Sequence, residues 1–348
     1  MQEISIAGRR IGPDHPPYVI CELSGNHNGE LARALKMLEA AKATGADAVK
    51  LQTYTADTIT LDHDSDQFRI KGGLWDGRRL YELYQEASTP WEWHEALFAK
   101  ARDLGITIFS TPFDKTAVDL LESLDAPAYK VASFEVVDLP LVEYIASKKK
   151  PMIISTGLAN LAEIQDVIAA ARRGGADQLV VLHCISAYPA PMEDANLRTI
   201  PNLSETFGVI SGLSDHTMGT AASVTAIALG GSVIEKHFTL ARADGGPDSA
   251  FSLEPEEFTR LVEDSKAAWA ALGRVRYDLK GSEAANIVFR RSLYVTRDVA
   301  AGEALTEDNV RSIRPGYGLP PKHLPEVLGR RASRDLARGE PLAWPMVE

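Results

Sequence analysis

The chain has 348 residues, of which 45% are hydrophobic and 24% are charged, and its formal net charge is −11. This composition is ordinary for a globular protein with one large core and a small appendage. The acidic balance argues against nucleic acid as a partner. No apolar run is long enough to span a bilayer, and no basic-then-apolar leader begins the chain, so we expect no membrane partner.

The two cysteines, Cys21 and Cys184, both lie in apolar, strand-like segments. This setting is typical of buried thiols rather than of a disulfide or a nucleophile. Free thiols are usual in a reducing compartment, and we therefore expect a cytoplasmic protein.

The first 275 residues alternate between short apolar runs and helical patterns. Each strand candidate is nearly all apolar, as expected of parallel strands that are covered on both faces. Eight strand–helix units in this length predict an α/β fold, a (β/α)₈ TIM barrel. The predicted strands are 18–23, 48–52, 107–111, 128–133, 152–156, 179–184, 209–214 and 233–238.

Three further segments complete the predicted organisation of the chain. Residues 2–12 form a hairpin that we expect to close the barrel floor. The connection 53–88 is unusually long, which is typical of a lid or a binding loop. After a linker at 276–290, residues 291–348 contain an internal repeat, Asp-Val-Ala-Ala-Gly-Glu-Ala-Leu and Asp-Leu-Ala-Arg-Gly-Glu-Pro-Leu. This repeat predicts a small, pseudo-symmetric β-rich domain.

Two histidines, His216 and His237, follow the seventh and eighth predicted strands. Neighbouring parallel strands end at the same mouth of a barrel, so the two imidazoles should lie close together. A pair of imidazoles suits a divalent metal that keeps positions open for water or substrate. Each ring alone could equally be a hydrogen-bonded structural histidine, and we give that structural role to His27 and His183, which lack such a partner.

All eight predicted strands end in polar residues. Barrel active sites lie at these ends. Lysines and hydroxyls together suit the phosphate and carboxylate of a small anion, and Glu22, Glu135 and Asp248 suit sugar hydroxyls or proton transfer. Taken singly, a lysine there is usually solvated, and Thr111, Ser155 or Ser186 could cap the next helix. The other polar residues at the strand ends are Lys50, Gln52, Lys130, Ser133, Tyr188, Ser214 and Lys236. The set favours an aldol-type condensation of a phosphorylated acid with a polyol.

Six motifs in chain order resemble the sialic acid synthase family, and Arg-Ser-Ile-Arg-Pro-Gly-Tyr-Gly at 311–318 resembles its antifreeze-like (SAF) domain. Within the family, Leu-Ser-Gly-Asn-His-Asn-Gly (23–29) and Ile-Ser-Ala-Tyr-Pro-Ala (185–190) are most similar to the pseudaminic acid synthase branch, as is the stretch 74–94. The six motifs lie at 22–29, 50–55, 109–114, 129–135, 212–217 and 235–238.

The resemblance implies a reaction and a set of roles. This branch condenses phosphoenolpyruvate with 2,4-diacetamido-2,4,6-trideoxy-L-altrose to give pseudaminic acid and phosphate. Mn²⁺, or alternatively Mg²⁺ or Co²⁺, would bind His216 and His237. We expect the catalytic residues to be Glu22, Glu135, His216 and His237, with Glu135 as the candidate that guides water to C2. Phosphoenolpyruvate would contact Lys50, Thr111, Lys130, Ser133, Ser155, Ser186 and Ser214. The sugar would contact Glu22, Gln52, Tyr188 and Asp248.

The resemblance also implies a homodimer in which the SAF domains are swapped, so that Arg314 of one subunit reaches the acetamido sugar in the other. One position departs from the sialic acid synthases, because Ser186 stands where they place an asparagine at the phosphate. Serine is shorter and offers fewer donors, but the pseudaminic branch has serine here too.

Three alternatives stay open at this point. The same chemistry on another acetamido sugar would give N-acetylneuraminate or legionaminate. A Schiff-base aldolase would use Lys50 or Lys130 as the nucleophile. A carbohydrate- or ice-binding module built on the tail alone would leave the polar strand ends without a role.

Overall fold

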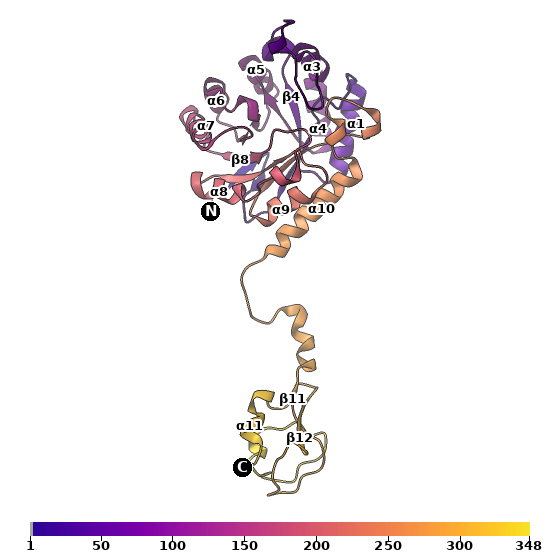
Figure 1. The fold of residues 1–348 in the computed structure, drawn as a ribbon, viewed down its shortest axis with the longest axis vertical. Helices are drawn as coiled ribbons and strands as arrows, with labels where there is room; N and C mark the ends of the chain where they lie inside the picture. The colour runs from indigo at the N-terminus through magenta and orange to yellow at the C-terminus, as the bar shows by residue number, and fades with distance from the viewer. Residues whose placement is uncertain (1–2) are drawn as a thin grey trace. The chain divides into compact units, whose positions relative to one another are not determined.

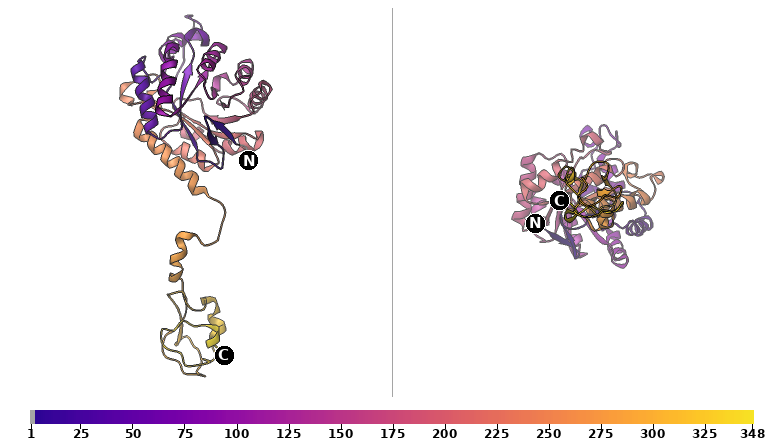
Figure 2. Two further views of the ribbon diagram at one scale, coloured as in Figure 1. Left: turned by 180° about the vertical axis from the view of Figure 1, so that it is seen from behind. Right: turned by 90° about the horizontal axis from the view of Figure 1, so that it is seen from below.

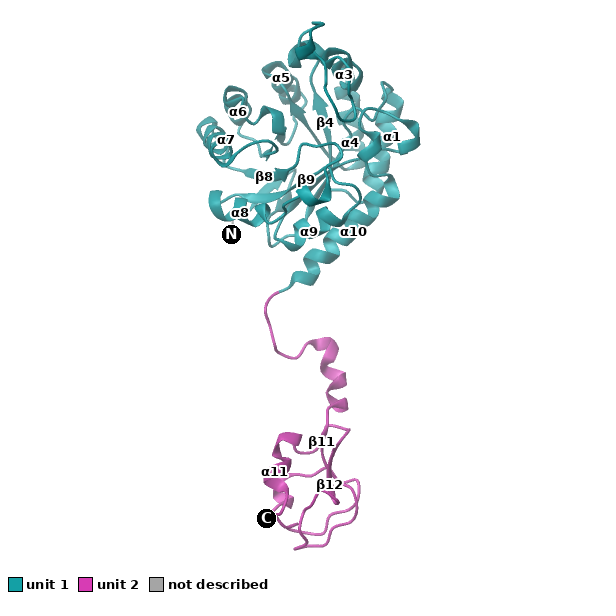
Figure 3. Ribbon diagram, in the orientation of Figure 1, with its two compact units in different colours: residues 1–273 teal, residues 274–348 magenta. Residues whose placement is uncertain are grey.

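The computed structural model describes residues 3–348 and divides the chain into two compact units, Met1–Gly273 and Arg274–Glu348 (Figure 3). Gln2, the first residue of the predicted hairpin 2–12, lies outside the described residues. Within residues 3–348, no helix has both the length and the apolar character needed to cross a membrane.

The first unit is a closed barrel of eight parallel strands, which confirms the predicted fold (Figure 1). The barrel closes where β10 pairs with β3. The strands are nearly all buried, as their apolar sequences require. They are β3 (Tyr18–Glu22), β4 (Ala48–Thr53), β5 (Thr107–Pro112), β6 (Tyr129–Val131), β7 (Met152–Ser155), β8 (Leu179–Cys184), β9 (Ile210–Asp215) and β10 (Val233–His237).

Helices surround the strands on the outside of the barrel (Figure 2). Several begin at side-chain caps: Asp114 accepts from the backbone of α5, and Asn160 and Glu163 form a capping box at α7. The helices that follow the strands are α1 (Leu31–Ala43), α4 (His94–Leu104), α5 (Lys115–Ser123), α6 (Leu139–Ala146), α7 (Leu161–Gly174), α8 (Thr199–Phe207), α9 (Ala221–Ala228) and α10 (Pro255–Leu272).

A hairpin closes one end of the barrel, as predicted. Strands β1 (Ile4–Ile6) and β2 (Arg9–Ile11) pair antiparallel around a turn at Ala7 and Gly8, both of which have positive φ. The side chains of Ile4, Ile6 and Ile11 join a buried cluster with the inward-facing residues at the beginnings of the barrel strands. The hairpin therefore seals the floor, and the opposite mouth is left for function.

The long connection after β4 has a structure of its own. It contains α2 (Ala56–Ile59) and α3 (Leu80–Ala87), and between them an isolated antiparallel bridge joins Arg69 to Arg79. Its tip is fastened to the connection after β10, since the indole nitrogen of Trp75 donates to the carbonyl oxygen of Pro247 at 3.0 Å. The connection is therefore held over the mouth of the barrel.

The second unit has its own small core around Leu293, Leu305 and Leu342. Strands β11 (Ser292–Val295) and β12 (Val310–Ile313) pair antiparallel, and a short helix, α11, spans Leu324–Val327. A 3₁₀ helix at Gly281–Phe289 precedes them, within the predicted linker.

The two copies of the internal repeat contact each other through equivalent atoms. Val299 and Leu336 exchange two backbone hydrogen bonds of 2.9 Å. The Asp298 carboxylate accepts from the backbone of Arg338, and the Asp335 carboxylate accepts from the backbone of Ala301. Arg338 lies three residues after Asp335, and Ala301 lies three residues after Asp298, so the two contacts are equivalent. This is the pseudo-symmetry that the repeat predicts.

Candidate active site

The two predicted metal ligands lie side by side at the mouth of the barrel. In β9 and β10, Asp215 pairs in register with Lys236, so the next residues, His216 and His237, are neighbours. Their ring centroids are 5.4 Å apart, and both side chains are buried. The crossover through α9 delivers this arrangement, as the sequence predicts.

Both imidazoles have the chemistry of metal ligands. The Nδ1 of His216 bonds to the carbonyl oxygen of Ile185 at 2.9 Å, which leaves Nε2 as the free nitrogen. The Nδ1 of His237 is buried without a hydrogen-bond partner. Burial, together with His216 and nearby lysines, holds the pKa of His237 well below its usual value, so the ring is neutral and able to coordinate.

Residues 3–348 contain no cluster of three or more His, Cys, Asp or Glu side chains arranged to hold a metal. Asp248 lies 3.8 Å from Nδ1 of His237 and is bound by the hydroxyl of Ser24. Burial raises the pKa of Asp248 to about 6. The two histidines therefore fit a metal that takes its remaining ligands from water or substrate.

Two buried lysines face two buried carboxylates beside the histidines. The ammonium of Lys50 is 2.6 Å from Glu22 and donates to the Thr111 hydroxyl at 3.0 Å. Glu235 lies between the lysines, 3.5 Å from Lys50 and 3.4 Å from Lys130. Burial alone would raise the pKa of Glu235, but Lys130 and Lys50 hold it below its usual value. The carboxylate thus stays charged between two cations.

Glu235 is a residue that our sequence analysis missed. It lies two positions before His237 on the same strand, and side chains two apart in a strand point to the same face. Because side chains alternate along a strand, counting back two residues from His237 would have predicted that Glu235 faces the inside of the barrel. Lys236 was included among the polar strand-end residues, but it points the other way.

Lys236 and Asp215 form a buried ion pair of 2.8 Å on the outer face of β9 and β10. The Asp215 carboxylate also accepts from the hydroxyls of Thr217 and of Ser223 in α9. Lys236 donates to the carbonyl oxygen of Thr217 at 2.7 Å. This network ties the two strands together directly behind the two histidines.

Serine hydroxyls gather around Gly157 at the end of β7. The Ser133 hydroxyl accepts from the backbone N–H of Gly157 at 3.0 Å, and the Ser155 hydroxyl is buried with no partner. A Cβ on Gly157 would overlap the hydroxyl of Ser186 and lie 2.8 Å from that of Ser133. The glycine therefore lets Ser133 and Ser186 approach each other, while Ser214 donates to Glu235 at 3.2 Å.

The alternative that strand-end hydroxyls cap the following helices is wrong for Thr111 and Ser155. The caps of α5 and α7 are Asp114 and Asn160 instead. The N-terminal flanking residue of α8 is Arg198, so Ser186 caps no helix either. These three hydroxyls are left available at the mouth.

Glu135 lies at the end of a single 3₁₀ turn after β6, Ser133–Glu135. Burial raises its pKa to about 7, and Lys130 and Lys50 oppose that rise. One carboxyl oxygen is buried without a hydrogen-bond partner. A carboxyl of this kind can gain or lose a proton near neutral pH.

Aromatic rings form a wall beside the histidines. The ring centroid of Tyr188 is 4.4 Å from that of His216, and that of Phe251 is 4.9 Å from His237. The Trp75 ring lies 5.6 Å from Tyr188. Gln52, on the far side, donates to Glu22 at 3.0 Å.

The remaining predicted residues are the two cysteines, two further histidines and Arg314. Cys21 and Cys184 are buried and free, as expected. His27 and His183 are buried, and His183 bonds to the carbonyl oxygen of Ala195 at 2.7 Å, in keeping with structural roles. Arg314 belongs to the second unit, where it directly follows β12.

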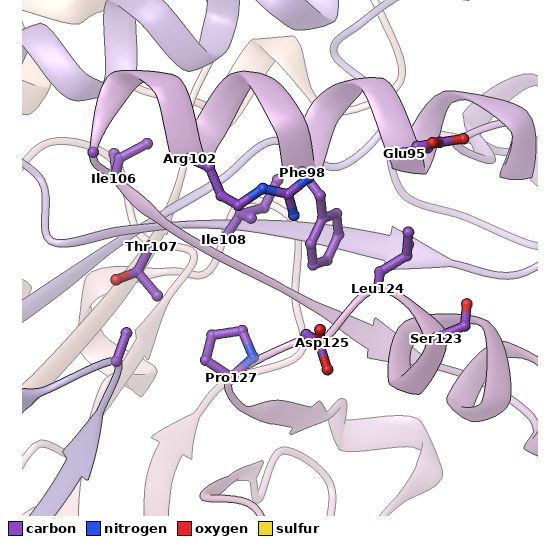
Figure 4. Close-up of a pocket in the computed structure, with 12 residues that line it drawn as sticks. Glu95, Phe98, Arg102, Ile106, Thr107, Ile108, Ser123, Leu124, Asp125 and Pro127 are labelled. Carbon is purple, nitrogen blue, oxygen red and sulfur yellow. The ribbon is translucent and has the colours of Figure 1, made fainter.

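A pocket of about 920 Å³ lies at the other end of the barrel, between α4, α5 and the beginning of β5 (Figure 4). It includes Ala7 of the floor hairpin, and its charged residues, Glu95, Arg102 and Asp125, are exposed. It shares no residue with the polar cluster at the mouth.

The chain is similar to known proteins over most of its length. The chain is 49% identical over 335 residues to a pseudaminic acid synthase of Helicobacter pylori, covering 96% of this chain and 98% of that one. It is 47% identical over 329 residues to a pseudaminic acid synthase of Campylobacter jejuni, covering 94% and 96%. An N-acetylneuraminic acid synthetase structure from Leptospira borgpetersenii aligns with a TM-score of 0.73 at 29% identity, covering 82% and 95%.

Sequence models of two families match consecutive parts of the chain. The SAF domain matches residues 290–348, in agreement with the resemblance seen at 311–318. The NeuB family matches residues 37–277, which hold almost all of the site at the barrel mouth. The chain therefore belongs to the NeuB family.

Proposed function

We propose that this protein is a pseudaminic acid synthase, which condenses phosphoenolpyruvate with 2,4-diacetamido-2,4,6-trideoxy-L-altrose to give pseudaminic acid and phosphate. The observation that carries the proposal is near-half identity, over almost the whole chain, to two proteins of that activity. In this proposal residues 1–275 are the catalytic barrel, 276–290 the linker and 291–348 the SAF domain.

Phosphoenolpyruvate binds among the lysines and hydroxyls at the mouth. Lys50 and Lys130 neutralise its carboxylate and phosphate. These anionic groups need cationic partners because they lose their hydration when they bind at a buried site. Support comes from the unpartnered hydroxyl of Ser155 and from the close approach of Ser133 and Ser186 over Gly157. Thr111 and Ser214 complete the set of donors. The bound anion then replaces part of the countercharge that Glu22 and Glu235 supply.

His216 and His237 hold a divalent cation, with Mn²⁺ first and Mg²⁺ or Co²⁺ as alternatives. The support is the pair of adjacent buried imidazoles, one with an unpartnered nitrogen. When bound, such a cation supplies Lewis-acid polarisation of the sugar's aldehyde oxygen. Glu22, Gln52, Tyr188 and Asp248 line the space beside it and orient the open-chain sugar.

The side chains of this protein then bind, orient and move protons. C3 of phosphoenolpyruvate forms a bond to the aldehyde carbon, whose oxygen takes up a proton from solvent and becomes a hydroxyl, and water adds at the C2 cation that results. Glu135 accepts the proton that this water loses, because its pKa of about 7 suits a base at neutral pH. The C2 hydroxyl then loses its proton to solvent and becomes a keto group as the C2–O bond to phosphate breaks, and phosphate leaves while Lys130 and the serines stabilise its charge.

The functional unit is a homodimer in which Arg314 of one subunit reaches the sugar bound in the partner's barrel. Large apolar side chains are exposed on the connections at the mouth, which is unusual for a surface that stays in water. The two units also differ in charge. Residues 274–348 carry 13 of the chain's 37 Lys and Arg but only 10 of its 48 Asp and Glu. The exposed apolar residues are Phe134, Val137, Leu158, Leu161, Met192 and Met218.

The test is to incubate the protein with phosphoenolpyruvate, Mn²⁺ and one of three sugars, and to measure phosphate release. The sugars are the L-altrose derivative, N-acetylmannosamine and the bacillosamine-derived precursor of legionaminate. We expect the highest kcat/KM with the first. A higher value with either other sugar would replace the proposed product with N-acetylneuraminate or legionaminate.

Borohydride trapping addresses the Schiff-base alternative in the same experiment. Burial lowers the pKa of Lys130, which is the one observation that favours a nucleophilic lysine. Labelling of Lys130 or Lys50 by trapped substrate would support the aldolase. Loss of turnover on chelation, without trapping, would support the proposed condensation.

A further inference from the structure

Trp75 lies near the tip of the long connection after β4, between α2 and α3. Its neighbour Leu74 is largely exposed, whereas Trp75 is half-buried and its indole N–H donates to the carbonyl oxygen of Pro247 at 3.0 Å. Pro247 directly precedes Asp248, which lies beside His237. Two connections from opposite ends of the barrel sequence are thus joined over the mouth by this one side chain.

The Trp75 ring extends the aromatic wall away from the histidines. Tyr188 is in ring contact with His216 at 4.4 Å and with Phe251 at 5.4 Å, and Trp75 adds the next ring at 5.6 Å from Tyr188. A sugar whose aldehyde lies at the two histidines would therefore place its far end one ring further along, against the indole.

The indole offers that far end an apolar face only. Its single N–H is already used by Pro247, and tryptophan has no acceptor. A hydroxyl pressed against this face would lose its water without gaining a partner, which is costly, whereas a methyl group would lose nothing. The surface therefore distinguishes a deoxygenated carbon from a hydroxylated one.

We propose that Trp75 is a specificity-determining residue that selects sugars lacking the C6 hydroxyl, by packing its indole face against the C6 methyl group. This inference rests on the proposed function and names the feature of the substrate that the site recognises. The Leu-Trp-Asp-Gly motif at 74–77 then has a role in the choice of sugar rather than in the chemistry.

The test compares two sugars that differ only at C6: the 2,4-diacetamido-2,4,6-trideoxy sugar and its analogue with a C6 hydroxyl. Trp75→Ala should lower the ratio of their kcat/KM values about tenfold, which is typical of a small apolar contact. The change should appear in the sugar KM, while the KM for phosphoenolpyruvate stays within about twofold of wild type.

Two variants that keep a larger side chain than alanine guard against a simple folding defect. Trp75→Phe keeps an apolar face and should retain the preference for the deoxy sugar. Trp75→Gln presents polar atoms and should shift the preference toward the hydroxylated analogue.

Trp269→Ala is the matched control. The indole N–H of Trp269 in α10 donates to the carbonyl oxygen of Pro13 at 3.0 Å, the same kind of contact at a site that holds none of the residues of the mouth. We expect its sugar preference to equal that of wild type.

The outcomes separate this inference from the proposed function. If Trp75→Ala and Trp75→Gln lower kcat/KM equally for both sugars, the tryptophan only fastens the connection and the inference is overturned, although the function stands. If the wild-type enzyme releases phosphate with neither sugar, the proposed function fails and this inference fails with it.

Discussion

Asp215 and Lys236 each precede one of the two histidines, yet their side chains lie on the opposite face of the strands. Asp215→Asn would leave the Lys236 ammonium buried without its charged partner, with only neutral acceptors such as the carbonyl oxygen of Thr217. Removing one member of a buried pair costs about 3 kcal/mol or more. We therefore expect the free energy of unfolding to fall by about that amount in urea denaturation.

The same variant should weaken Mn²⁺ binding about tenfold in a direct titration, because residues that support metal ligands have effects of this size. Asp47→Asn is the control. It breaks the half-buried Arg9–Asp47 pair at the floor, and we expect lower stability with unchanged Mn²⁺ affinity. Equal weakening of Mn²⁺ binding in both variants would show that general loosening, not positioning, is responsible.

Glu135 should set the pH dependence of turnover. Its pKa is raised by burial to about 7, with Asp138 adding to the rise and Lys130 and Lys50 opposing it. Only the ionised carboxylate accepts a proton, so kcat should rise with pH through about 7. Glu135→Gln should lower kcat about 100-fold and remove that rise, as measured by phosphate release between pH 5.5 and 8.5, roughly one to two units either side of the pKa.

Stability provides a second measurement on the same variant. The pKa of Glu135 is higher in the folded protein than its ordinary value of 4.5. Its contribution to stability is therefore complete below about pH 4.5 and is lost as pH rises through about 7. Glu135→Gln has no such loss, so it should become more stable relative to wild type across that range. A constant difference would contradict the raised pKa.

At the scale of single residues, sequence patterns predicted most of the polar side chains that lie together at the mouth of the barrel. Spacing around one crossover placed His216 and His237 correctly, because parallel neighbours end together. Glu235 was missed because it lies within an apolar strand rather than after it. Lys236 was misassigned for the related reason that adjacent strand residues face opposite sides. Pairing partners such as Glu22 with Lys50 depend on three-dimensional contacts that no pattern specifies.

Among the elements, the turn after β7 requires glycine at position 157. A Cβ on Gly157 would collide with the hydroxyls of Ser133 and Ser186. Gly157→Ala should therefore push the two serines apart and raise the KM for phosphoenolpyruvate about tenfold or more, since small displacements of binding groups have large kinetic effects. Steady-state kinetics with varied phosphoenolpyruvate measures this directly.

Gly281→Ala is the control for that change. No atom lies within 4 Å of the Cβ position at Gly281, so the same substitution should leave the kinetics unchanged. If Gly157→Ala also leaves the KM unchanged, the two serines are not phosphate ligands.

Strand boundaries were predictable where an apolar run is continuous. The predicted strand 179–184 agrees with β8, which reads Leu-Val-Val-Leu-His-Cys. The predicted strand 128–133 is longer than β6, because its last residues leave the sheet for the 3₁₀ turn that positions Glu135. The bridge between Arg69 and Arg79 was not foreseen, because residues 69–79 show no alternating apolar pattern.

For the whole molecule, subunit mixing tests the exchange of Arg314. Arg314→Ala and His216→Ala should each be nearly inactive as homodimers. In a mixed dimer, one barrel with intact histidines receives an intact Arg314 from its partner, so one site of two is complete. Co-expression in equal amounts should restore about a quarter of wild-type activity.

The opposite arrangement gives a different result. If Arg314 serves the barrel of its own chain, every site in the mixed dimer lacks either the arginine or the histidine, and the mixture stays inactive. Light scattering on the same samples would check that mixed dimers are present.

The reciprocal contacts of the tail carry information about its origin. Its two repeats bind each other through equivalent residues, as two copies of a half-length chain would in a symmetric dimer. Joining such copies in one polypeptide frees each to diverge without breaking the pair. Only the first copy is followed by the Arg-Ser-Ile-Arg-Pro-Gly-Tyr-Gly segment. The reciprocal contacts thus hold the two halves of the tail together, while the segment that carries Arg314 has no counterpart among them.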